Sequence, residues 1–85
     1  MKQLESIKYG LNSRVKLFQN TKKEVFLIID RKSRVVMKDG LRIVEIAEKI
    51  KNKEQYTGFF LKTSAPVCGK TKLYLNNQNI FIKPI

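Results

Sequence analysis

The segment Val25 to Ile29 most constrains the fold, because five consecutive residues in it are apolar. A strand with one exposed face alternates apolar and polar side chains, so this run predicts a central strand covered on both faces. Residues 57–62 contain a second such run, Phe59 to Leu61, and predict another strand of the same kind. Between the two strands, residues 40–52 place apolar side chains at helical spacing. A strand that is reached through a helix is expected to run parallel to its neighbour by a right-handed crossover.

Shorter patterns predict the remaining elements. Leu4, Ile7 and Leu11 follow a helical spacing, and Gly10 is expected to end that helix. Asp39 is positioned to cap the helix at residues 40–52. The full predicted order is helix 1–10, strands 14–18, 25–29 and 34–37, helix 40–52, strand 57–62, helix 69–77 and strand 80–82. We therefore predict one α/β (α+β) domain, residues 1–85, with a mixed sheet of about five strands and helices on both faces. The first three strands are expected to be antiparallel and the later ones parallel.

The charge of the chain indicates the sign of its partner. The 85 residues include 18 Lys and Arg but only 7 Asp and Glu, a net charge of +11, and no acidic residue follows Glu54. Such an excess attracts polyanions through long-range Coulomb forces and counterion release. We therefore expect nucleic acid, either DNA or RNA, as the partner.

The densest basic cluster follows the predicted strand 25–29. Three of the four Arg residues lie there, and the planar guanidinium of Arg suits the geometry of phosphate. An ordinary solvated turn and helix face is the alternative explanation. The residues predicted to contact phosphates, largely without regard to base sequence, are Arg31, Lys32, Arg34, Lys38 and Arg42, extended by Lys62, Lys70 and Lys72.

Residue types that enzymes commonly need are missing from the sequence. It contains no histidine, so triads built on imidazole are excluded, and its single cysteine, Cys68, rules out an internal disulfide and a multi-cysteine zinc site. Cys68 precedes a predicted helix, where its thiol would be activated, but a small buried residue is the simpler interpretation. We predict no catalytic residue, no cofactor and no metal.

Gly69-Lys70-Thr71 resembles the end of a nucleotide-binding P-loop. That motif requires a glycine five positions before Gly69, where this chain has Ser64. Pro66 also removes a backbone donor from the loop that would hold the phosphates. The P-loop is therefore rejected, and a helix start able to hold one phosphate remains.

Asp30-Arg31-Lys32 ends a predicted strand, and an acid followed by Lys at this place resembles metal-dependent restriction-type nucleases. The predicted order of helix, three strands, helix and strand is similar to their core over about 60 residues. The resemblance implies Mg²⁺ held at Asp30 and a phosphate polarised by Lys32. That chemistry needs a second acid on the preceding strand, and residues 14–18 offer none. A degenerate nuclease-like domain is therefore a lesser alternative.

Protein partners form the other class of alternative. An acidic protein surface would also match the charge, and an edge strand at 14–18 or 80–82 could pair with a neighbour or with a second copy. No apolar run approaches a membrane span or a secretory signal, so we expect no membrane and a cytoplasmic location. Core packing is expected for Phe26, Phe59, Phe60 and Phe81, which leaves Tyr9 and Tyr56 as candidates for stacking on bases.

Overall fold

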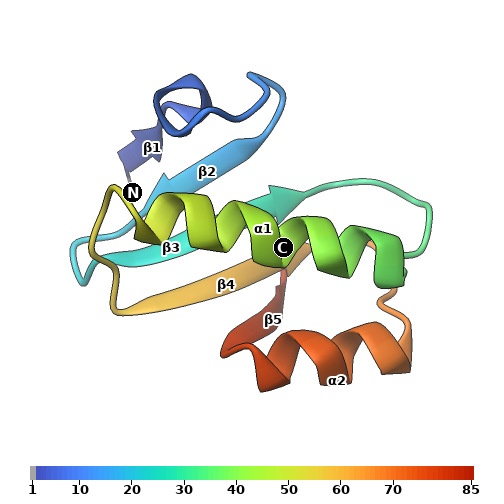
Figure 1. Cartoon of the computed structure of the whole chain (residues 1–85). Helices are drawn as coiled ribbons and strands as arrows, with labels where there is room; N and C mark the ends of the chain where they lie inside the picture. Colours follow the sequence, from blue (N-terminus) through green and yellow to red (C-terminus); the bar gives the residue numbers. More distant parts are fainter. Residues whose placement is uncertain (1) are drawn as a thin grey trace.

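A mixed five-stranded sheet with the spatial order β1-β2-β3-β4-β5 organises the fold (Figure 1). The computed structural model describes residues 2–85. Strands β1, β2 and β3 form an antiparallel meander, whereas β3, β4 and β5 run parallel. The strand bounds are β1 Lys2–Leu4, β2 Lys16–Gln19, β3 Glu24–Ile29, β4 Gly58–Thr63 and β5 Ile80–Pro84. The predicted mixed sheet, its strand count and its parallel half are confirmed.

Both α-helices lie on the same face of the sheet (Figure 1). Helix α1 (Met37–Lys51) connects β3 to β4, and α2 (Gly69–Asn77) connects β4 to β5. Because both crossovers are right-handed and advance in one direction across the sheet, they place their helices on one side. The helices pack closely, since a Cβ atom added at Gly40 of α1 would stand 3.0 Å from Cγ2 of Thr71 in α2. The prediction of helices on both faces is therefore wrong.

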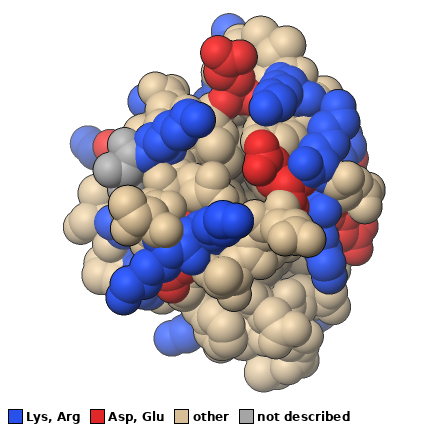
Figure 2. All heavy atoms as spheres, turned by 90° about the vertical axis from the view of Figure 1, so that its left-hand side faces the viewer, with Lys and Arg blue, Asp and Glu red and all other residues tan. Residues whose placement is uncertain are grey.

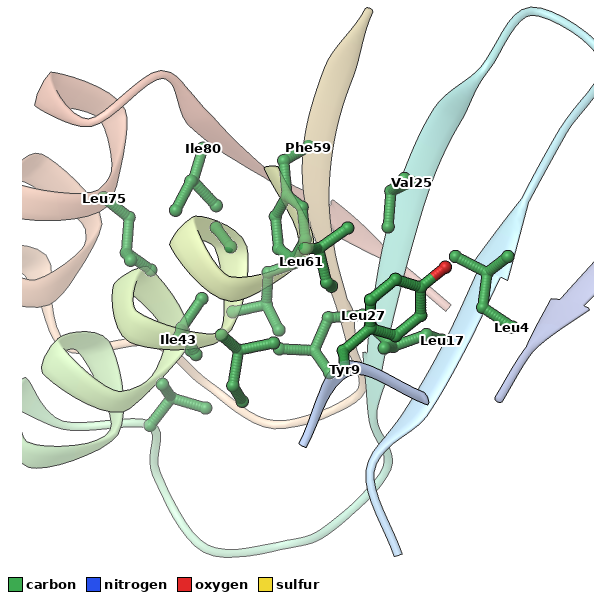
Figure 3. Close-up of a cluster of buried hydrophobic side chains, with 14 of the residues drawn as sticks. Leu4, Tyr9, Leu17, Val25, Leu27, Ile43, Phe59, Leu61, Leu75 and Ile80 are labelled. Carbon is green, nitrogen blue, oxygen red and sulfur yellow. The ribbon is translucent and has the colours of Figure 1, made fainter. Parts of the chain in front are cut away.

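The hydrophobic core lies between this helical layer and the sheet (Figure 3). Side chains of a strand alternate between faces, so Val25 and Leu27 of β3 point toward the helices together with Phe59 and Leu61 of β4. Each such fully buried side chain contributes about 1.5–3 kcal/mol of hydrophobic stabilisation. The residues that complete the core include Leu4, Tyr9, Leu17, Ile43, Ile46, Ile50, Leu75 and Ile80.

The chain begins differently from the prediction. Residues 1–10 were expected to form one helix, but the described part contains β1 and a short 3-10 helix, η1 (Ser6–Tyr9). Leu4 is opposite Leu17 in the antiparallel pairing of β1 with β2, so it reaches the core from a strand. Tertiary pairing thus overrides the helical spacing of the apolar residues. Gly10 ends η1 with a left-handed backbone, φ 73°, as its sequence position indicated.

The predicted strand 34–37 is also absent. Only Val35 makes a bridge, to Val67, and α1 begins directly afterwards at Met37. The backbone N–H of Val36 donates to the carboxylate of Asp39 at 3.0 Å, which stabilises a helix start three residues before Asp39. Asp39 therefore lies in the first turn of α1 and is not its N-cap residue. None of the described helices is long and apolar enough to cross a membrane.

Candidate nucleic-acid interface

The loops that follow β3 and β4 meet at one end of the sheet. The N–H of Val35 donates to the carbonyl of Pro66 at 2.9 Å, and the N–H of Cys68 donates to the carbonyl of Val35 at 3.0 Å. These bonds place the starts of α1 and α2 beside each other, at the right of Figure 1. We call the exposed cations gathered there the basic end, namely Lys32, Arg34, Lys38, Arg42, Lys70 and Lys72.

Arg31 belongs to the same loop but has a structural role. Its Nη2 lies 2.7 Å from the Asp39 carboxylate and 3.2 Å from the carbonyl of Arg34, and its Nε donates to the carbonyl of Ser33 at 3.2 Å. Partial burial alone would raise the pKa of Asp39, but the bonds from Val36 and Arg31 outweigh it and lower that pKa. The guanidinium of Arg31 thus folds the loop around itself and has few donors left for a phosphate.

The six residues of the basic end are free of such partners. All six are exposed. Among the described side chains, none of the six has a carboxylate within ion-pair distance, since the ion pairs present are Lys8–Glu54, Arg31–Asp39 and Lys49–Glu45. Asp39 lies close enough to Lys38 to interact with its charge, but no ion pair within residues 2–85 holds any of the six cations. Solvent ions therefore supply much of their compensation, and a polyanion can displace these ions.

The opposite end of the molecule looks different. Figure 2 shows it with Lys and Arg side chains in several separate places, and Asp and Glu side chains between some of them. Lys8 and Glu54, which form an ion pair, belong to this end. The basic residues of the chain thus differ in their surroundings, because some of those at this opposite end lie beside acidic side chains.

Lys62 does not join the other predicted phosphate contacts. It lies on the face of the sheet that points away from the helices, where its Nζ is 5.5 Å from the centroid of the Phe26 ring. The structure therefore separates the predicted set of eight into the basic end, the internally bonded Arg31, and Lys62.

The sheet surface around Lys62 carries two rows of side chains that cross neighbouring strands. Residues paired across β2, β3, β4 and β5 share a face, and no described helix lies against this one. We call it the open face. Its aromatic row consists of Phe18, Phe26, Phe60 and Phe81. Its basic row consists of Lys16, Lys62 and Lys83, with Ile28 of β3 between Lys16 and Lys62.

Three rings of the aromatic row lie near one another, and two of them have a lysine above them. The ring centroids of Phe26 and Phe60 are 5.2 Å apart, and those of Phe60 and Phe81 are 6.3 Å apart. The Nζ of Lys83 lies 4.5 Å from the centroid of Phe60, within the range of a cation–π interaction. Phe26 is only 5% exposed under these neighbours, whereas Phe81, at the end of the row, is 48% exposed.

Sequence reasoning missed this arrangement because it assigned these aromatics to the core. Of the four Phe residues, only Phe59 belongs to the core cluster. The prediction is wrong for Phe81, which is exposed, and for Phe60, which is half-buried on the open face. Tyr9 is instead buried, with its hydroxyl donating to Glu54 at 3.2 Å, and the hydroxyl of the half-buried Tyr56 lies 3.5 Å from the carbonyl of Ala47.

A hollow of about 350 Å³ lies beside the basic end, between the start of β2, the end of β3 and α1. Arg14, Arg31 and Arg42 line it together with Asp30 and Asp39. Arg14 was not predicted as a site residue, because its proximity depends on the antiparallel pairing of β2 with β3. From the sequence alone, the only indication of a role for Arg14 was that it is one of the four arginines.

Cys68 occupies the N-cap position of α2 and is half-buried. The backbone N–H groups of Lys70 and Thr71, followed by the Thr71 hydroxyl and the charge of Arg34, lower the pKa of this thiol. The surroundings thus favour the thiolate, contrary to the expectation of an ordinary buried residue.

Asp30 is bonded within the same pair of loops. Its carboxylate accepts a hydrogen bond of 2.6 Å from the Ser64 hydroxyl. Within residues 2–85, no three Cys, Asp or Glu side chains gather as a metal site would require. The predicted amino-terminal helix, on which the nuclease resemblance also depended, is replaced by β1 and η1, whereas three strands, a helix and a strand still follow in order as β1, β2, β3, α1 and β4. The nuclease-like alternative therefore stays a prediction, with no cluster of three carboxylates among the described residues to support it.

Comparison of the chain with protein-family models, with curated proteins and with solved structures finds no match. The basic end and the open face are therefore the features of the molecule that indicate its function.

Proposed function

We propose that this protein binds nucleic acid, DNA or RNA, through the phosphate backbone and without catalysing a reaction on it. The observation that supports the proposal best is the basic end, where six exposed cations have no acidic partner among the described residues. Contacts from Lys and Arg to phosphates confer affinity and orientation but carry little base specificity. The proposal includes a cytoplasmic location for this activity.

The two arginines of the basic end have the stronger individual role in this proposal. Arg34 lies in the loop before α1, and Arg42 lies in α1 one turn after Lys38. A guanidinium offers paired donors to a phosphate, whereas an ammonium acts as a point charge. Lys38 and Arg42, four residues apart, project from one side of the helix and can follow one backbone.

The test is fluorescence anisotropy with labelled single-stranded and duplex oligonucleotides of mixed sequence at several salt concentrations. We expect the logarithm of the binding constant to fall linearly with the logarithm of the salt concentration. The slope should be about −0.7 to −0.9 per neutralised phosphate. Weak binding with a flat slope at low salt would refute the proposal.

Two triple variants with the same loss of charge locate the contact. Arg34→Gln, Lys38→Gln and Arg42→Gln together should lower affinity and flatten the salt slope by about two to three units. The control combines Lys2→Gln, Lys22→Gln and Lys51→Gln, three exposed lysines outside the basic end. Equal losses in the two variants would mean that net charge, and not the basic end, determines binding.

Docking on an acidic protein is the rival proposal, favoured by the outer edge of β5, which no strand covers in the described chain. The other predicted edge, at 14–18, is wrong, because β2 is paired with both β1 and β3. Pull-downs before and after nuclease treatment separate the two proposals. Partners that disappear with nuclease support nucleic-acid binding, and partners that persist support protein docking. Light scattering tests whether a second copy pairs at the same edge.

A further inference from the structure

We propose that the open face binds a single strand of nucleic acid, with the aromatic row contacting bases and the basic row contacting phosphates. This inference rests on the proposed function and adds the strand type and the surface. It starts from the layering of the fold, in which both α-helices cover one face of the sheet and leave the other without cover in the described chain.

The open face combines the two chemistries that a single strand requires. Phe60 and Phe81 offer partly exposed rings on adjacent parallel strands, with centroids 6.3 Å apart. Lys62 and Lys83 are paired in the neighbouring row of the same two strands. Base stacking on aromatic side chains next to a basic groove is how single-stranded nucleic acids are held without strong sequence preference.

Two lysine side chains lie over aromatic rings, and a bound phosphate can displace them from these rings. Lys83 lies over Phe60 at 4.5 Å, and Lys62 lies over Phe26 at 5.5 Å. A phosphate that attracts the Lys83 ammonium draws it away from the ring and frees that ring face for a base. The same side chain therefore covers the aromatic surface in the free protein and holds the backbone in the complex.

The positive charge of the open face favours a nucleic-acid strand over a second copy of the chain as its occupant. Glu24 is the one acidic residue in the described strands, and its carboxylate already accepts a bond of 2.8 Å from the Asn20 side chain. Two open faces packed together would oppose lysines to lysines, which is unfavourable. A single strand instead supplies negative charge and flat apolar bases together.

A duplex fits the open face less well. Its bases are stacked inside the helix, so rings that project from a sheet surface cannot reach their faces. In other proteins, a four-stranded sheet with aromatic side chains on its surface stacks about two or three bases. We therefore expect preference for single strands at this face, while the basic end contacts phosphates of either form.

The experiment compares fluorescein-labelled oligothymidylate of about 12 nucleotides with a duplex of equal length. The wild-type protein should bind the single strand more tightly. Phe81→Leu, which keeps an apolar side chain but removes the ring, should weaken single-strand binding by about 5- to 150-fold. Phe81→Tyr, the matched control that keeps the ring, should bind like the wild type. Because Phe81 is 48% exposed, neither change should unfold the protein, and circular dichroism checks this.

The outcomes separate this inference from the proposed function. If Phe81→Leu binds as tightly as the wild type while the basic-end variant loses affinity, the inference is overturned and the proposed function stands. If the wild type binds neither oligonucleotide, both are overturned. If light scattering shows a dimer that Phe81→Leu dissociates, a second copy occupies the open face and the inference fails.

Photocrosslinking of the wild-type protein to the oligothymidylate gives a readout that needs no variant. Crosslinks at Phe60 or Phe81, located by mass spectrometry, support the inference. Crosslinks confined to residues 30–42 and 69–72 overturn it.

Discussion

Both faces of the sheet carry phenylalanine, but in different environments. Phe59 and Phe60 are neighbours in the chain, yet Phe59 is 1% exposed within the core, whereas Phe60 is half-buried on the open face. The difference arises from the crossovers, which place α1 and α2 over the same side. An aromatic side chain in this sheet therefore contributes to stability or to surface recognition according to which way its strand position points.

The largest expected effect is a difference in protein stability between substitutions on the two faces of the sheet. Phe59→Ala should reduce the free energy of unfolding by about 3–5 kcal/mol, because it leaves a cavity in the core. Phe81→Ala, its counterpart on the open face, should reduce it by less than about 1 kcal/mol. Urea unfolding followed by circular dichroism measures both. Similar losses would contradict the distinction between the faces.

An intermediate effect concerns the helical layer that covers one face. Gly40→Ala places a Cβ atom 3.0 Å from Thr71 Cγ2, so the buried Thr71 side chain or the helices themselves must shift by a few tenths of an ångström. The free energy of unfolding should fall by about 1–3 kcal/mol. Gly69→Ala is the control, since a Cβ there meets nothing within 4 Å, and it should be neutral or slightly stabilising. Thermal unfolding of both variants tests this, and a stable Gly40→Ala protein would argue against close packing of the helices.

The smallest effect concerns the start of α1. Asp39→Asn should destabilise the protein by about 0.5–2 kcal/mol at neutral pH, because it weakens the bonds to Val36 and Arg31. Since folding lowers the pKa of Asp39, its contribution is complete above the unfolded value of about 3.9 and is lost as the pH falls through the folded pKa.

Urea unfolding of the wild type and of Asp39→Asn across this acidic range is the measurement. The difference between the two proteins should shrink as the pH falls below the folded pKa. A difference that stays constant would show that the carboxylate charge is not involved.

Local patterns predicted the parallel half of the fold well. The helix at 69–77 has the predicted bounds, and β3, β4 and β5 lie within two residues of their predictions. These segments have strong apolar runs or clear periodicity. The amino-terminal region depends on the pairing of Leu4 with Leu17, a contact between distant residues that spacing alone does not reveal.

The candidate site was predicted in part for a similar reason. The basic end follows from charges that are close in sequence on two loops, although the meeting of the loops depends on the Val35–Val67 bridge and the bond from Ser64 to Asp30. The open face was missed because a run such as Val25 to Ile29 looks alike whether its second face is covered by helices or by lysines. Arg31 appeared free because its partner Asp39 lies eight residues later, across the turn into α1.

The bridge between the two loops has a consequence for redesign. It is made of main-chain groups, with the N–H donors at Val35 and Cys68. The neighbouring residues Arg34 and Lys70 are exposed, so their side chains can be exchanged to alter binding while the scaffold stays intact. Proline at position 35 or 68 would remove one donor of the bridge and weaken the connection between the two loops, which the bond from Ser64 to Asp30 would still join.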